Sequence, residues 1–169
     1  MDTTPLRLAY RALLDAAETV AASGETSPPP PAGEWNAEQI LAHVAIVTAA
    51  TTAVVAAVAS GTNATYDNRI AQDNWTIAGV ISLAGDNAGL RNRIRGHGDA
   101  LCALGGSVLT QTEWDRPVPT LLVSHDTVLV DQPLPLSEII AGLAAVELPG
   151  HTRQLLALLP DTDGTGIAI

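Results

Sequence analysis

The sequence predicts an all-α protein: a four-helix bundle with one small β-hairpin before its last helix. Several long stretches carry aliphatic residues at the spacing of an amphipathic helix. Hydrophobic residues make up 47% of the 169 residues, yet only 3% are aromatic and Phe is absent. A core built from Ala, Leu, Val and Ile suits closely packed helices. Two short β-branched runs around residues 124–126 predict the hairpin.

An apolar stripe at helical spacing predicts the first helix at residues 4–22, with Pro5 tolerated in its first turn. The stripe consists of Leu6, Tyr10, Leu13, Leu14 and Ala17. A proline-rich connector follows at residues 23–35, and its four consecutive prolines favour an extended polyproline conformation.

The second helix is expected to begin after Asn36, which can cap it, because Gln39 three residues later completes a capping-box pattern. Gly61 is expected to close it. Residues 44–59 are uncharged but include three threonines, which indicates a buried helix rather than a membrane span. One face of this helix is formed by Ile40, His43, Val47, Thr51, Val54 and Val58.

The remaining elements are a broken helical region, the hairpin and a last helix. Residues 64–104 are expected to be helical, with glycines 79, 85 and 89 weakening the helix so that two helices could meet at a bend. The runs TLLV and TVLV flank the hairpin turn, and the last helix spans residues 136–159, before Pro160. Residues 1–160 therefore form one predicted domain, and residues 161–169 form a polar tail.

Three polar residues interrupt two of the apolar stripes and predict a metal site. His43 lies in line with Ile40 and Val47, while Glu147 and His151 occupy the core stripe of the last helix, one turn apart. Two imidazoles and one carboxylate are a ligand set of catalytic zinc, which leaves a coordination position open. The alternative is structural: hydrogen-bonded core histidines, with Glu147 paired to His151.

Pro149 lies between the last two candidate ligands. It removes a backbone N–H from the helix and presses its ring against the preceding turn. A local kink is therefore expected at this point of the last helix.

The segments GEWNAEQILAHVAIV and ELPGHTRQLLALL resemble the second and last helices of the DinB/YfiT-like superfamily. The order His, then Glu-x-x-x-His, is closest to the N-terminal domain of the mycothiol-dependent maleylpyruvate isomerase branch. The resemblance implies a metal-binding helix bundle with His43, Glu147 and His151 as ligands. The isomerase has a further C-terminal domain, so the resemblance implies thiol chemistry rather than maleylpyruvate isomerisation.

Composition restricts the function classes. The net charge of −10 argues against nucleic-acid binding, which relies on cations to neutralise phosphates. All eight basic residues are Arg, which excludes a Schiff-base or P-loop lysine. Cys102 is the only cysteine, so a reducing cytoplasm is expected.

These observations favour a metal-dependent enzyme acting on a small molecule, with Zn²⁺ as the first candidate and Ni²⁺ or Fe²⁺ as alternatives. Mycothiol or another small thiol would be the co-substrate of a transferase or isomerase. A metal-dependent hydrolase and a non-enzymatic metal- or ligand-binding bundle are the alternatives. Arg69 is a candidate for holding a substrate carboxylate, or else a solvated residue at a helix start. Alanines on a second side of the second helix predict a homodimer.

Overall fold

The computed structural model describes residues 1–24 and 34–160, which are mostly helical with a small three-stranded sheet. The prediction of a mainly helical protein is confirmed at this level. Most of the proline-rich connector and the predicted tail at 161–169 lie outside the described residues. The helices are α1 (Thr4–Ala22), α2 (Ala37–Ala59), α3 (Asn74–Ala84), α4 (Asn87–Ser107), α5 (Gln111–Trp114), α6 (Leu136–Gly142) and α7 (Leu148–Leu156). The other elements are the 3-10 turn η1 (Arg69–Ala71), the π-helical turn η2 (Leu143–Glu147) and the strands β1 (Tyr66–Asp67), β2 (Pro117–Ser124) and β3 (Thr127–Pro135).

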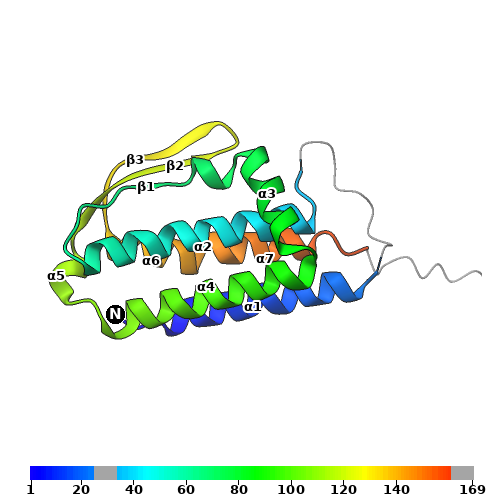
Figure 1. Ribbon diagram of the computed structural model, residues 1–169, viewed down its shortest axis with the longest axis horizontal. Helices are drawn as coiled ribbons and strands as arrows, with labels where there is room; N and C mark the ends of the chain where they lie inside the picture. The colour runs from blue at the N-terminus through cyan, green and yellow to red at the C-terminus, as the bar shows by residue number, and fades with distance from the viewer. Residues whose placement is uncertain (25–33, 161–169) are drawn as a thin grey trace, which may run out of the picture.

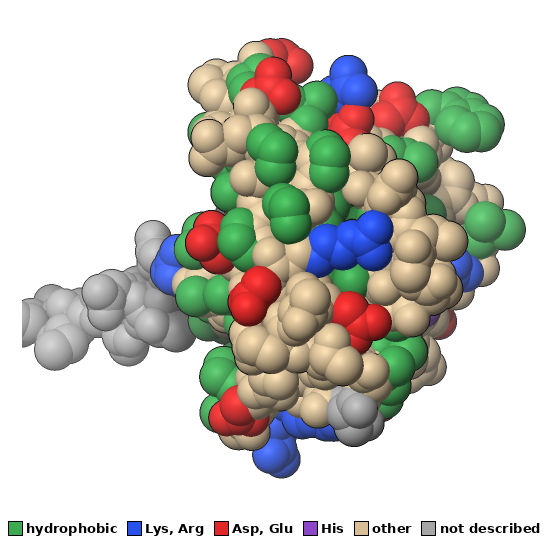
Figure 2. Space-filling model, turned by 90° about the vertical axis from the view of Figure 1, so that its left-hand side faces the viewer, with side chains coloured by type: hydrophobic (Ala, Val, Ile, Leu, Met, Phe, Trp, Pro, Cys, Tyr) green, Lys and Arg blue, Asp and Glu red, His purple; other side chains and the backbone are tan. Residues whose placement is uncertain are grey.

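Long helices pack side by side along the longest axis, and the sheet lies on one side of them (Figure 1). α2 packs against α4, and α1 packs against α4 and α7. The core between them is built from aliphatic residues and alanines, together with Tyr10, Tyr66 and Trp114. Figure 2 views the end of the molecule where α5 lies, and there acidic and basic side chains are scattered among hydrophobic ones.

The two N-terminal helices form where the sequence predicts them. α1 has the predicted bounds, and the capping box at the start of α2 is present. Asn36 Oδ1 accepts from the Gln39 backbone N–H at 2.9 Å, and Gln39 Oε1 accepts from the Asn36 N–H at 3.0 Å. All six residues of the predicted α2 face are buried. By length and composition α2 could cross a bilayer, but most of it is buried, and the core helix of a soluble protein passes the same test.

The prediction of helix from residue 64 onward is wrong for its first ten residues. They form β1, η1 and the connection to α3, because Tyr66 and Asp67 pair in parallel with β2. Beyond that point the region contains two helices, as the glycines suggested. Gly85 ends α3 with a φ of 83°, and Asp86 caps α4 through the Gly89 N–H. α3 is apolar but mostly exposed: Trp75 and Leu83 are 85% and 77% exposed.

The hairpin is confirmed and is longer than predicted. β2 and β3 pair antiparallel from Pro117↔Pro135 to Ser124↔Thr127, with an irregularity near Val123. The two-residue turn has positive φ at His125 (47°) and Asp126 (60°), as in the primed turns that match the strand twist.

The last helical segment is continuous from α6 through η2 to α7 and is not broken by Pro149. In η2 the Leu148 N–H bonds to the carbonyl of Leu143, five residues back, which widens the helix by one residue. Pro149 follows directly after this turn, at the point where the π-helical hydrogen-bond pattern returns to the α-helical one. A π-helical turn thus immediately precedes Pro149, and α7 ends at Leu156 rather than at 159.

Candidate metal centre

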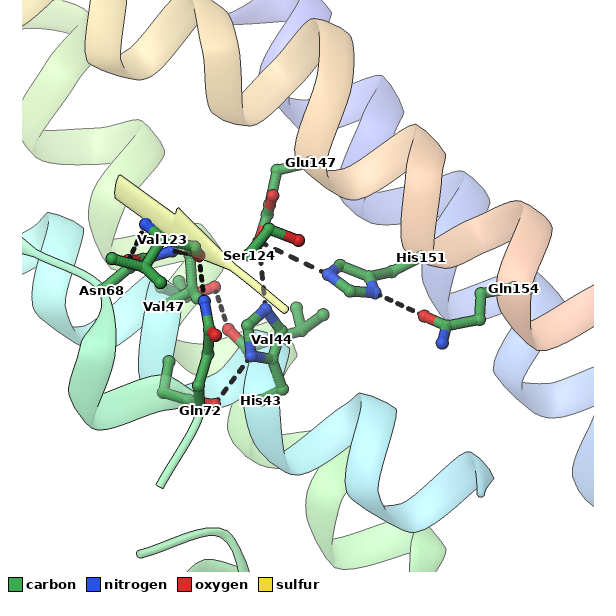
Figure 3. A network of polar contacts seen from close by, with 12 residues as sticks. His43, Val44, Val47, Asn68, Gln72, Val123, Ser124, Glu147, His151 and Gln154 are labelled. Carbon is green, nitrogen blue, oxygen red and sulfur yellow. Dashed lines mark hydrogen bonds and ion pairs between the residues drawn. The ribbon is translucent and has the colours of Figure 1, made fainter. Parts of the chain in front are cut away.

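The three residues predicted as ligands lie together although 104 residues separate His43 from Glu147. His43 Nε2 is 3.0 Å from Glu147 Oε1, and His151 Nε2 is 3.4 Å from the same oxygen. One ligand atom from each residue lies within 4.8 Å of the other two. Two ligands bound tetrahedrally to zinc at about 2.0–2.1 Å are about 3.3 Å apart. The cluster therefore has the dimensions of a metal site, and Figure 3 shows Glu147 facing both imidazoles.

Two helices position the cluster. α2 buries His43 on its core face, so that its side chain is only 4% exposed. Glu147 ends the π-helical turn and His151 lies one turn later on α7, with side chains 36% and 15% exposed. The cluster is thus closed toward the core at His43 and reachable by solvent at Glu147.

The outer nitrogens of both imidazoles have hydrogen-bond acceptors. His43 Nδ1 lies 2.8 Å from the Ala71 carbonyl, which can only accept, so Nδ1 must carry the proton. His151 Nδ1 lies 2.9 Å from Gln154 Oε1. In a neutral imidazole the other nitrogen, Nε2, then has its lone pair free. Two Nε2 lone pairs thus point at a carboxylate oxygen, and the centre needs a cation, whether protons or a metal ion. This arrangement, with the second nitrogen bonded to a carbonyl, is usual for metal-binding histidines.

Glu147 is the charged member of the cluster. Burial by itself would raise the pKa of its carboxyl group. When protons rather than a metal ion occupy both Nε2 atoms, the hydrogen bonds that His151 and His43 then donate outweigh burial and hold that pKa well below the ordinary range. Among the described residues, the two imidazoles are its hydrogen-bonding and ion-pair partners. The carboxylate therefore lies in an apolar stripe with no arginine to balance it.

Sequence reasoning missed the residues that surround the cluster. The Trp35 ring lies 4.8 Å from the His43 ring and 6.4 Å from the His151 ring, centroid to centroid, and covers both imidazoles. Gln154 could have been found from its spacing, three residues after His151 on the same helix. Nothing in the sequence points to the Ala71 carbonyl, because any residue type has one.

Arg69 does not join the cluster. Its guanidinium forms a bidentate pair with Asp67, with Nε 3.0 and 2.9 Å from the two carboxylate oxygens. The pair is on the surface, where the Arg69 side chain is 67% exposed. Its role in substrate binding stays a prediction without a contact to support it.

Two surface cavities lie elsewhere. One of about 350 Å³ lies between α1 and α4 and is lined by Arg7, Tyr10, Arg95 and Cys102, among others. The other, of about 290 Å³, lies beside α2 and β1. Neither is lined by a member of the His–Glu–His cluster. The cluster is the stronger candidate site, because it brings three potential metal ligands within 4.8 Å of one another.

Comparison with known protein families, with curated proteins and with solved structures finds no match for this chain. The resemblance of two segments to the DinB/YfiT-like superfamily therefore stays a prediction.

Proposed function

We propose that His43, Glu147 and His151 bind a divalent metal ion, zinc first and nickel or iron as alternatives. One observation carries the proposal: the Nε2 atoms of two imidazoles converge on one carboxylate oxygen, and no arginine in the described part of the chain pairs with that carboxylate. A carboxylate without a compensating charge is destabilising here, but by less than the roughly 3–5 kcal/mol of a broken buried pair, because the Glu147 side chain is 36% exposed. A metal ion supplies that charge and accepts all three lone pairs.

The proposed activity is that of a metal-dependent thiol transferase or isomerase, with mycothiol or a similar small thiol as co-substrate. A divalent ion bound here lowers the pKa of a thiol or a water molecule, so that a nucleophile forms near neutral pH. The protein holds both imidazoles by their Nδ1 atoms, covers them with Trp35 and leaves Glu147 partly open to solvent. The thiol itself is supported by the resemblance of the two ligand-bearing segments to the maleylpyruvate isomerase branch.

Two other functions have their own support. If water is the activated group, the same centre serves a hydrolase. A metal site that maintains structure or senses the ion is favoured by a different observation, since His43 is buried and the Trp35 ring packs beside both imidazoles.

Metal content tests the first step of the proposal. We expect about one equivalent of zinc in the purified parent protein and its loss in His43→Ala. His97→Ala is the matched control, because His97 lies on α4 outside the cluster. Equal metal content in the parent and His43→Ala, measured by elemental analysis, would contradict the proposal.

Turnover assays separate the three functions. The zinc-loaded protein should conjugate or isomerise model electrophiles when mycothiol is present and lose this activity in His151→Ala. Thiol-independent cleavage of model esters would identify the hydrolase. Zinc binding without turnover in either assay would favour the non-enzymatic function.

A further inference from the structure

Asn68 joins the segment before η1 to the hairpin through its side-chain amide. Its Oδ1 accepts from the Val123 N–H at 2.8 Å, and its Nδ2 donates to the Val123 carbonyl at 3.0 Å. The Asn68 backbone N–H also bonds to the Leu121 carbonyl at 3.3 Å. The amide therefore extends the pairing of β1 with β2 one residue beyond the end of β1, in the manner of a backbone peptide group.

Gln72 makes a second link from the other end of η1. Its Nε2 also donates to the Val123 carbonyl, so one carbonyl of β2 accepts from two side-chain amides. Asn68 and Gln72 are the residues on either side of η1 (Arg69–Ala71). The 3-10 turn is thus attached to the hairpin at both of its ends, as Figure 3 shows.

The backbone carbonyl of Ala71, which lies between Asn68 and Gln72, is the hydrogen-bond acceptor of His43. Ala71 ends η1 and is 1% exposed, and the last carbonyls of a helical turn have no partner within it. His43 Nδ1 donates to this carbonyl at 2.8 Å, which fixes its proton on Nδ1 and points the Nε2 lone pair at Glu147. A shift of η1 would move this acceptor and free the ring.

We infer that Asn68 and Gln72 are positioning residues of the His43 imidazole: they tie η1 to Val123 and so hold the Ala71 carbonyl that selects the tautomer of the ring. This inference rests on the proposed metal centre. The hairpin then has a role in the site although it supplies none of the three ligand atoms.

The Nδ1 proton of His43 gives a test that needs no metal. We expect a slowly exchanging Nδ1–H resonance of His43 in the nitrogen-15 spectrum of the metal-free parent, in either protonation state of the ring. Gln72→Met and Asn68→Ala should each speed its exchange by about fivefold or more, the equivalent of one lost hydrogen bond. The controls are Gln132→Met on exposed β3 and Asn63→Ala, which loses only a surface bond from Arg116.

Cobalt(II) binding gives a second readout. Both variants should bind cobalt about 10–100-fold more weakly than the parent, as outer-shell changes usually do, and should alter its visible absorption bands. Exchange rates and cobalt affinities within about twofold of the parent in both variants would overturn the inference. Unfolding of both variants, seen by circular dichroism, would also overturn it, because Asn68 and Gln72 would then be needed for folding rather than for orienting the His43 ring.

Failure of the proposed function is distinguishable from failure of this inference. A parent that takes up no cobalt would remove the metal centre, while the His43 proton would still show whether Asn68 and Gln72 hold the ring. A parent in which that proton lies on Nε2 would overturn the inference whatever its cobalt affinity.

Discussion

The substitution Glu147→Gln tests whether Glu147 is a metal ligand or only a hydrogen-bond partner of His43 and His151. The substitution keeps the shape of the side chain and removes its charge. In the metal-free protein the new amide can donate to an Nε2 lone pair, since Nδ1 of each ring is already bonded to another group. We therefore expect the free energy of unfolding of the metal-free protein to change by less than about 1 kcal/mol.

Zinc should raise the stability of the parent protein much more than that of Glu147→Gln. Zinc at a hundred times its dissociation constant adds about 2.7 kcal/mol to the stability of a protein that binds it only when folded. For a chain of this size, each kcal/mol shifts the unfolding midpoint by about 2–4 °C, so the parent should gain about 5–11 °C. Glu147→Gln should gain little, because it offers two imidazoles and a neutral oxygen.

The assay is thermal unfolding followed by circular dichroism, with and without zinc after chelator treatment. Glu138→Gln, at an exposed position of α6, is the matched control and should respond as the parent does. If Glu147 were only a structural partner, its replacement would cost the metal-free protein about 2 kcal/mol, allowing for a side chain that is 36% exposed. That loss, together with no zinc response in the parent, would refute the reasoning, as would an undiminished response in Glu147→Gln.

Four further predictions concern the acid range, the core, the π-helical turn and assembly. The lowered pKa of Glu147 gives the metal-free fold stability that is present above the ordinary carboxyl range and lost as pH falls below about 4; in acid titration we expect the parent to lose less than about 1 kcal/mol relative to Glu147→Gln, because the carboxylate is 36% exposed, and a larger loss would favour a purely structural partner. Tyr10→Phe should cost about 1 kcal/mol in urea unfolding, because the Tyr10 hydroxyl donates to buried Thr48 Oγ1 at 2.9 Å; no change would contradict this. Pro149→Ala should change the free energy of unfolding by less than about 1 kcal/mol, and a gain near 3 kcal/mol would show that the π-helical turn does not relieve the proline. The predicted homodimer should scatter light as twice the 17.4 kDa of one chain, and the monomer mass at all micromolar concentrations would exclude it.

The spacing of hydrophobic residues along the sequence was enough to predict most of the helices and to select the three candidate ligands. The spacing of Leu6, Tyr10 and Leu13 is enough to predict α1, because a helix repeats its buried face every three to four residues. Polar residues within such a stripe are visible in the sequence because burying them is costly. For this reason His43, Glu147 and His151 could be selected without a structure.

Features that depend on contacts between distant segments of the chain could be seen only in the tertiary structure. Tyr66 and Asp67 form a strand only because β2, more than fifty residues later, offers them hydrogen bonds, so periodicity assigned them to a helix. How the backbone accommodates Pro149 depended on how the surrounding turns share their hydrogen bonds, and the α-helical turn after η2 keeps Glu147 and His151 on one face. The partner of His43 Nδ1 is a backbone carbonyl, which every residue carries, so only the packing of η1 against α2 could single out Ala71.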